Sequence, residues 1–197
     1  MKILKNVFVS ILILFFFTNN SWSKSASEFI SSLSIEASNI LSSKLSDDEK
    51  IIRLKEIGER SVDIKGVGFY TLGKYRKTLT DDQKKQYEEL FKAYFLKSFS
   101  GRLVGYSDAK IAVISEEIKN EKYTIVYSKL IGNTDRPEVK IDWRVYTKDP
   151  ENPLIRDLII EGLSLARTQK EEFNSIIVNN DGSIEALFEN LNRFLEN

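Results

Sequence analysis

The sequence contains no cysteine and no histidine among its 197 residues. Without cysteine the chain has no disulfide bond, no thiolate nucleophile and no lipidated cysteine. Without histidine it has no Ser-His-Asp or Cys-His catalytic arrangement, and nearly every kind of zinc site is excluded as well. We therefore expect a protein that is not an enzyme and that holds no metal and no cofactor.

The chain also lacks an excess of charge of either sign, because 29 Lys and Arg residues balance 29 Asp and Glu residues. A neutral chain has no broad basic field to attract nucleic acid, so we expect no nucleic-acid partner. Carboxylates alone could still bind a metal, but the sequence has no EF-hand spacing.

Long apolar runs are equally scarce, and the one present lies at residues 7–17, after Lys2 and Lys5. It has the length of a secretory h-region and is too short for a membrane span of ~20 residues. Ser21 and Ser23 supply small residues at the positions that signal peptidase reads. We predict a signal peptide at residues 1–23, cleaved after Ser23, and a single periplasmic domain at residues 24–197. The alternative is an uncleaved anchor.

The most informative stretch is residues 139–178. Apolar and polar residues alternate at the start of this stretch, which predicts a half-buried strand with Val139, Ile141, Trp143 and Val145 on one face. A turn at residues 147–153 and a second β-rich run at 154–160 complete a hairpin. Thr168 with Glu171 offers a capping box for a following helix.

The part before this hairpin is helical, at residues 24–79. Apolar residues at helical spacing predict an amphipathic helix within 24–45, and Ser46 with Glu49 predicts the start of a second one. A third segment, 61–73, carries Gly66, Gly68 and Gly73, but their spacing matches neither the dinucleotide fingerprint nor the Walker loop. We expect these glycines to let helices pack closely or to leave room for a ligand.

The longest predicted helix begins at Thr80 and Gln83 and runs to about Leu103. One face carries a wide apolar stripe made of Tyr87, Leu90, Phe91, Tyr94, Phe95 and Phe99. Such a stripe is usually core, yet this one has more ring surface than a helix needs to dock, so it could also line a binding site.

Strands are predicted at about 102–115 and 122–131, before the two strands of the hairpin, with turns at 116–121 and 132–137. A final amphipathic helix follows Gly182. This order predicts an α+β fold in which helices pack on a curled antiparallel sheet of four to five strands.

Two features that suggest catalysis fail on inspection. Gly162-Leu163-Ser164 is half of a nucleophile elbow, but it lacks the second glycine and a histidine base. Asp157 and Glu161 on one strand lie ~13 Å apart, beyond the ~6.5–9.5 Å of inverting glycosidases.

Two segments resemble the MlaC family of periplasmic phospholipid-binding proteins, also called toluene-tolerance auxiliary components. The first is Asp157 with Glu161-Gly162-Leu163-Ser164-Leu165, and the second is Leu72-Gly73-Lys74-Tyr75-Arg76 followed by Thr80, Gln83 and Tyr87. The likeness covers most of residues 25–195. It implies an NTF2-like cone, a bound phospholipid as cargo, and two docking partners: an inner-membrane ABC transporter complex with MCE domains and an outer-membrane lipoprotein complex.

Under this interpretation, acyl chains would lie in an apolar cavity between helices and sheet, and the head group would stay near its mouth. The predicted walls are Val67, Tyr70, Tyr75, Phe91, Tyr94, Phe95, Phe99, Ile141, Trp143 and Val145, each of which could equally be ordinary core. The predicted head-group or mouth residues are Arg136, Leu163 and Ser164. Two alternatives remain open: an NTF2-like isomerase or hydratase, and a periplasmic adaptor without a cavity.

Overall fold

The computed structural model describes residues 25–105, 110–132 and 137–197. The predicted signal peptide and Arg136 therefore lie outside the described residues. The fold is α+β, as predicted, with helices on a curled and unclosed antiparallel sheet of five strands in the order β1-β2-β3-β4-β5. The strands are β1 Ile111–Asn120, β2 Tyr123–Leu130, β3 Val139–Tyr146, β4 Leu154–Ile160 and β5 Leu163–Ser164.

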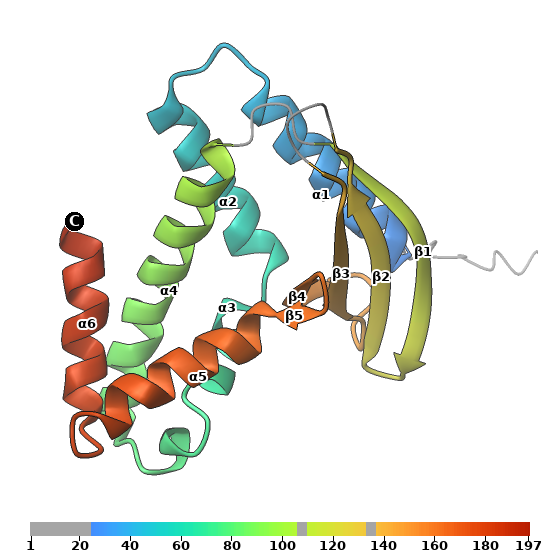
Figure 1. Ribbon diagram of the computed structural model, residues 1–197. Coiled ribbons are helices and arrows are strands. Elements are labelled where there is room, and N and C mark those ends of the chain that lie inside the picture. Colours follow the sequence, from blue (N-terminus) through green and yellow to red (C-terminus); the bar gives the residue numbers. More distant parts are fainter. Residues whose placement is uncertain (1–24, 106–109, 133–136) are drawn as a thin grey trace, which may run out of the picture.

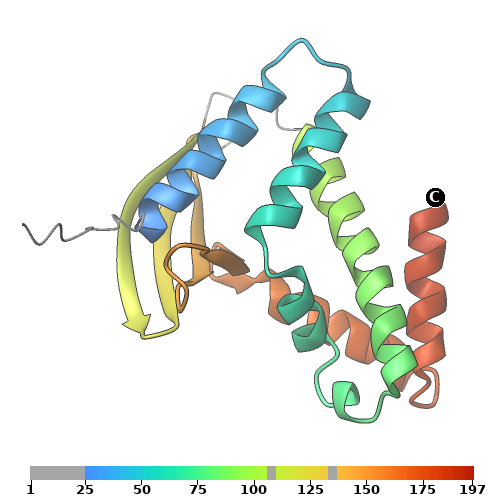
Figure 2. The same ribbon diagram turned by 180° about the vertical axis from the view of Figure 1, so that it is seen from behind.

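The protein has two halves, which Figures 1 and 2 show from opposite sides. The sheet half consists of the strands and α1 (Ala26–Leu41), which packs across β1 and β2. The helical half contains α2 (Asp47–Ser61), α3 (Ile64–Thr71), the short 3-10 helix η1 (Tyr75–Lys77), α4 (Asp81–Val104), α5 (Leu165–Val178) and α6 (Ile184–Glu196). None of the helices within the described ranges is long and apolar enough to span a membrane.

A side-chain cap lies at the start of each α-helix from α1 to α6. Ser46 and Glu49 form the predicted capping box of α2, and Thr80 and Gln83 form the one predicted for α4. The start of α5 was predicted wrongly at Thr168, because Ser164 is the N-cap and its Oγ accepts from the Arg167 N–H at 3.1 Å. The hydroxyl of Thr168 instead donates to the Ser164 carbonyl inside the helix.

The first strand also differs from its prediction. The charged residues from Glu116 to Asn120, expected in a turn, continue β1 and pair with β2. They can do so because β1 is an edge strand, where charged side chains face solvent without cost. The carboxylate of Glu116 also accepts a hydrogen bond from the Ser27 backbone N–H at the start of α1, at 2.6 Å.

The protein has two separate apolar cores. The helical core is formed by α3 to α6 and consists of Ile64, Leu72, Leu79, Tyr87, Phe91, Leu96, Phe173, Ile177, Ile184, Leu187, Phe188 and Leu191. The sheet core lies between α1, α2 and the sheet and consists of Ala26, Ile30, Leu33, Leu41, Leu54, Ile57, Val126, Val145 and Ile155. The apolar stripe of α4 thus packs mainly against other helices.

Gly68 confirms the prediction that a glycine in this segment allows close helix packing. A Cβ atom at Gly68 would lie 2.7 Å from the ring of Phe91 on α4. The carbonyl of Gly68 also accepts from the buried Tyr87 hydroxyl at 3.2 Å, and burial raises the pKa of that phenol far above its usual value. Tyr87 therefore stays protonated and keeps α3 on α4.

We expect Gly68→Ala to lower the free energy of unfolding by about 1–3 kcal/mol, because the ring of Phe91 must move out of a packed core. Gly101→Ala is the matched control, since a Cβ atom at this exposed position of α4 meets nothing within 4 Å. It should raise stability by about 0.5–1 kcal/mol through helix propensity. Urea unfolding of both variants measures the difference, and equal stabilities would contradict the close contact.

Candidate functional site

Part of the sheet presents apolar side chains that no helix covers fully. We call this set the apolar sheet face; it comprises Leu130, Val139, Ile141, Trp143, Leu158 and Ile160. Leu130 pairs with Val139, Ile141 with Ile160, and Trp143 with Leu158, so the side chains of each pair share one face. All except Ile141 remain partly exposed, whereas α1 packs over the neighbouring part of β1 and β2.

The indole of Trp143 is held in one orientation on this face. Its Nε1–H donates to the Ser128 hydroxyl at 2.8 Å, and that hydroxyl donates to the Ile141 carbonyl, also at 2.8 Å. Ser128 is fully buried, so both bonds are protected from water. The polar edge of the ring is thereby satisfied, and its remaining surface is available for apolar contact.

A row of side chains on α4 connects the two cores. Phe91, Phe95, Phe99 and Leu103 are spaced four residues apart and therefore follow one line along the helix; we call them the phenylalanine row. Phe91 is buried in the helical core, and Leu103 packs against the sheet core. The rings of Phe95 and Phe99 stack at 5.7 Å and 9° and stay partly exposed between the cores.

The predicted wall residues divide between these regions. Val67, Tyr75, Phe91, Tyr94 and Phe95 belong to the helical core or pack against it, Ile141, Trp143 and Val145 lie on the sheet, and Tyr70 is 41% exposed on α3. Phe91 and Val145 are almost completely buried, so their rings and methyl groups already have protein neighbours. The half-exposed positions Phe95, Phe99 and Trp143 offer more free apolar surface to a ligand. The assignment of these walls stays a prediction.

The predicted mouth residues lie at the junction of β5 and α5. Leu163 is exposed, and Ser164 donates its hydroxyl to Asp157 at 2.6 Å. Asp157 is only 5% exposed and also accepts from the Ala166 N–H, at 3.1 Å. The N–H groups of Ala166 and Arg167 at this helix start are therefore already satisfied within the chain, and a head-group contact here stays a prediction.

A polar cluster that no sequence pattern indicated joins the two halves. The guanidinium of Arg156 on β4 binds Asp63, the N-cap of α3, through Nε at 2.7 Å and Nη2 at 2.6 Å. Its Nη1 donates to the Tyr123 hydroxyl at 2.8 Å, and the group lies 4.1 Å from the centre of the Tyr146 ring. Burial lowers the pKa of Arg156, but the Tyr123 hydroxyl and the Asp63 charge outweigh it and raise that pKa. No local motif links Asp63 to a residue 93 positions away, so sequence alone gave no signal.

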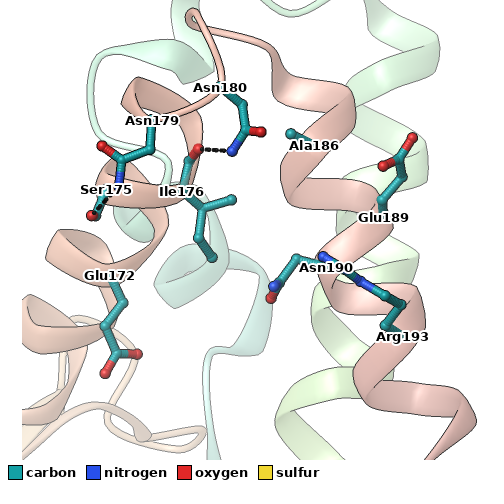
Figure 3. A pocket seen from close by; sticks show the side chains of 9 residues that line it. All are labelled: Glu172, Ser175, Ile176, Asn179, Asn180, Ala186, Glu189, Asn190 and Arg193. Carbon is teal, nitrogen blue, oxygen red and sulfur yellow. Dashed lines mark hydrogen bonds between the residues drawn. The ribbon is translucent and has the colours of Figure 1, made fainter.

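Two open hollows lie elsewhere. One, of about 580 Å³, is a polar groove between α5 and α6 (Figure 3), lined by Glu172, Ser175, Ile176, Asn179, Asn180, Ala186, Glu189, Asn190 and Arg193. The other, of about 500 Å³, lies between α1 and α2 and is lined by Ser32, Ile35, Glu36, Asn39, Ile40, Ser43, Leu45 and Arg53. Neither includes a predicted wall residue. In the described ranges no group of three acidic side chains is placed to hold a metal ion.

We expect Asp157→Asn to lower the free energy of unfolding by about 1–3 kcal/mol, since an amide cannot accept both of these buried hydrogen bonds. Glu56→Gln is the control, because Glu56 is exposed on α2 and the change should stay within about 0.5 kcal/mol. Urea unfolding compares the two variants. Hydrogen exchange at the first turn of α5 should increase in Asp157→Asn alone, and an unchanged rate would contradict this anchoring role.

The fold has a counterpart among solved structures. It is similar to the phospholipid-binding protein from Ralstonia solanacearum, whose structure is a complex with a phospholipid. The two share a TM-score of 0.72 and 18% sequence identity, over 88% of this chain and 98% of that one. At this level of identity the likeness shows a shared fold. The family model described as MlaC protein matches residues 32–193. That match spans most of the sequence, and the chain therefore belongs to the MlaC family.

Proposed function

We propose that this protein is a soluble periplasmic carrier that binds a glycerophospholipid and moves it between membrane complexes. The acyl chains would lie against the apolar sheet face and the phenylalanine row. The observation that carries the proposal is the partial exposure of large, stiff apolar side chains on both the sheet and α4, in a chain of the MlaC family. The bound phospholipid of the Ralstonia solanacearum protein, which has the same fold, supports this choice of ligand.

The energetics explain why a lipid needs such a carrier. Burying a methylene group lowers its free energy by ~0.8 kcal/mol. Two acyl chains with ~30 methylenes are therefore less stable in water than in a bilayer by on the order of 24 kcal/mol. If a protein buries the acyl chains to a similar extent, the free energy of transferring the lipid from a bilayer to the protein is close to zero. Apolar side chains that the free protein leaves partly exposed, such as Phe99 and Leu158, gain burial at the same time.

The alternative of an isomerase or hydratase requires a carboxylate free to act inside the fold. One oxygen of the partly buried Asp142 is shielded from solvent without a hydrogen-bond partner, but among the described residues Asp157 is the one carboxylate residue that is buried as a whole. Both of its oxygens already accept hydrogen bonds, from Ser164 and Ala166. These hydrogen bonds give Asp157 a structural role in holding the start of α5, which favours the carrier over an enzyme. The alternative of an adaptor predicts that Phe95 and Phe99 serve packing alone.

The partners belong to the same proposal. A carrier between two membranes needs a donor and an acceptor, and the family suggests an inner-membrane ABC transporter complex with MCE domains and an outer-membrane lipoprotein complex. Export requires the signal peptide proposed at residues 1–23, and no cofactor is needed. The direction of transport follows from these partners rather than from the binding site.

Native mass spectrometry of protein purified from the periplasm tests the cargo. We expect about one phospholipid per chain, lost on extraction with organic solvent. Trp143 gives a second readout, since Trp22 lies in the proposed signal peptide and Trp143 is then the only indole in the mature chain. A phospholipid with brominated acyl chains should quench its fluorescence. Protein without lipid, together with unquenched fluorescence, would favour the adaptor.

A charge placed on the apolar sheet face should prevent binding. We expect Leu158→Glu to reduce phospholipid occupancy at least tenfold, because the acyl chains would have to bury a carboxylate. Ile114→Glu is the matched control, since Ile114 is 57% exposed on the edge strand β1 and lies outside this face. Native mass spectrometry measures occupancy, and thermal unfolding shows that both variants fold. Full occupancy in folded Leu158→Glu protein would place the lipid elsewhere.

A further inference from the structure

Five cationic side chains gather where α5 meets the loop after α3. Lys74, Arg76 and Lys77 lie in and beside η1, and Arg167 and Lys170 lie on adjacent turns of α5. The side chain of Lys170 rests against Gly73, where a Cβ atom would lie 3.0 Å from its Cε. This contact joins the two segments into one surface, which we call the basic patch. η1 lies at the same end of the molecule as the first turn of α4, whereas α5 begins beside β5 (Figure 1).

These cations have no carboxylate partner within ion-pair distance among the described residues. Many lysines elsewhere are neutralised: Lys92 binds Glu59, Lys119 binds Glu117 and Lys129 binds Glu138, each at 2.6 Å. The patch is therefore a local concentration of charge on a chain whose overall charge is zero. Two acids lie close to it: Glu171 follows Lys170 on α5, and Asp81 is paired with Lys84.

Two of the five cations lie over aromatic rings. The ammonium of Lys170 is 5.2 Å from the centre of the Tyr70 ring, and that of Lys74 is 5.1 Å from the Tyr75 ring. Tyr70 is 41% exposed, and the exposed Leu163 and Leu165 lie at the beginning of α5. Lysine and arginine beside tyrosine and leucine are the side chains that favour the boundary between lipid head groups and water.

We propose that the basic patch docks this protein on a bilayer surface that contains anionic phospholipid. Basic side chains near such a surface each strengthen binding about fivefold, and tyrosine and leucine add contacts at the head-group level. The inference rests on charge and exposure, and it adds a membrane-facing surface to a protein proposed to carry lipid. An acidic protein partner would use similar chemistry, but it does not account for the exposed leucines beside the charges.

Vesicle flotation with the mature chain is the test. We compare vesicles of phosphatidylcholine alone with vesicles that contain about one third phosphatidylglycerol. The protein should float with the anionic vesicles at low salt and should be released at about 0.5 M salt, where screening is strong. Protein that floats with neither vesicle, or equally with both, overturns the proposal, and the first outcome would turn attention to an acidic protein partner.

A pair of triple variants separates the patch from net charge. Lys74→Gln, Arg76→Gln and Lys77→Gln together should weaken binding to anionic vesicles on the order of a hundredfold. Lys92→Gln, Lys119→Gln and Lys129→Gln together remove the same charge from lysines that are ion-paired elsewhere. This control should weaken binding less than about twofold beyond the common effect of net charge. If the two triple variants lost the same amount of vesicle binding, the binding would depend on net charge and not on a localised patch.

Native mass spectrometry of the same variants keeps this inference separate from the proposed function. We expect the patch variant to retain its phospholipid, because its substitutions lie outside the apolar sheet face and the phenylalanine row. Vesicle binding by protein that carries no cargo and shows no quenching by brominated phospholipid would refute lipid carriage and leave the docking surface standing. Loss of both cargo and vesicle binding in folded patch variant would refute the assignment of these residues to docking alone.

Discussion

The structure depends on one helix that serves two cores. Along α4, the phenylalanine row begins at the buried Phe91 of the helical core and ends at Leu103 against the sheet core. Between them Phe95 and Phe99 stack on each other but are only partly covered. Because the ends of the row are fixed by packing, the rings in its middle are held in place and keep part of their apolar surface exposed. That arrangement is suited to an apolar guest.

The sheet carries a second apolar surface whose side chains are also held in place by packing and hydrogen bonds. Trp143 is fixed by the buried hydroxyl of Ser128, and its cross-strand neighbour Leu158 stays partly exposed. A stiff surface loses little conformational entropy when it binds a ligand. Most of the free energy gained by burying apolar surface therefore contributes to affinity. The open hollow between α5 and α6, by contrast, is lined mainly by amides and charges (Figure 3) and is unsuited to hydrocarbon.

Local patterns predicted local structure well. The caps at Ser46 and Thr80 and the hairpin of β3 and β4 were all correct, because each depends on residues a few positions apart. One error, by contrast, involves a partner outside the local pattern. The start of α5 depends on Asp157 in another strand, and the sequence pattern favoured Thr168. Periodicity also could not separate buried Phe91 from half-exposed Phe99, since both lie on the same face of one helix.

The Arg156 cluster holds the start of α3 against β4. Beside it, Val62 forms a parallel bridge with Ile155, and the Asp63 N–H donates to the Ile155 carbonyl at 3.0 Å. The planar guanidinium then ties Asp63 to two tyrosines of the sheet. The backbone bridge, the backbone hydrogen bond and the ion pair together join the start of α3 to β4. One carboxylate thus has two tasks, since its Oδ1 accepts from the Gly66 N–H that begins α3 and its Oδ2 binds Arg156, and the direction in which α3 starts is fixed relative to the sheet.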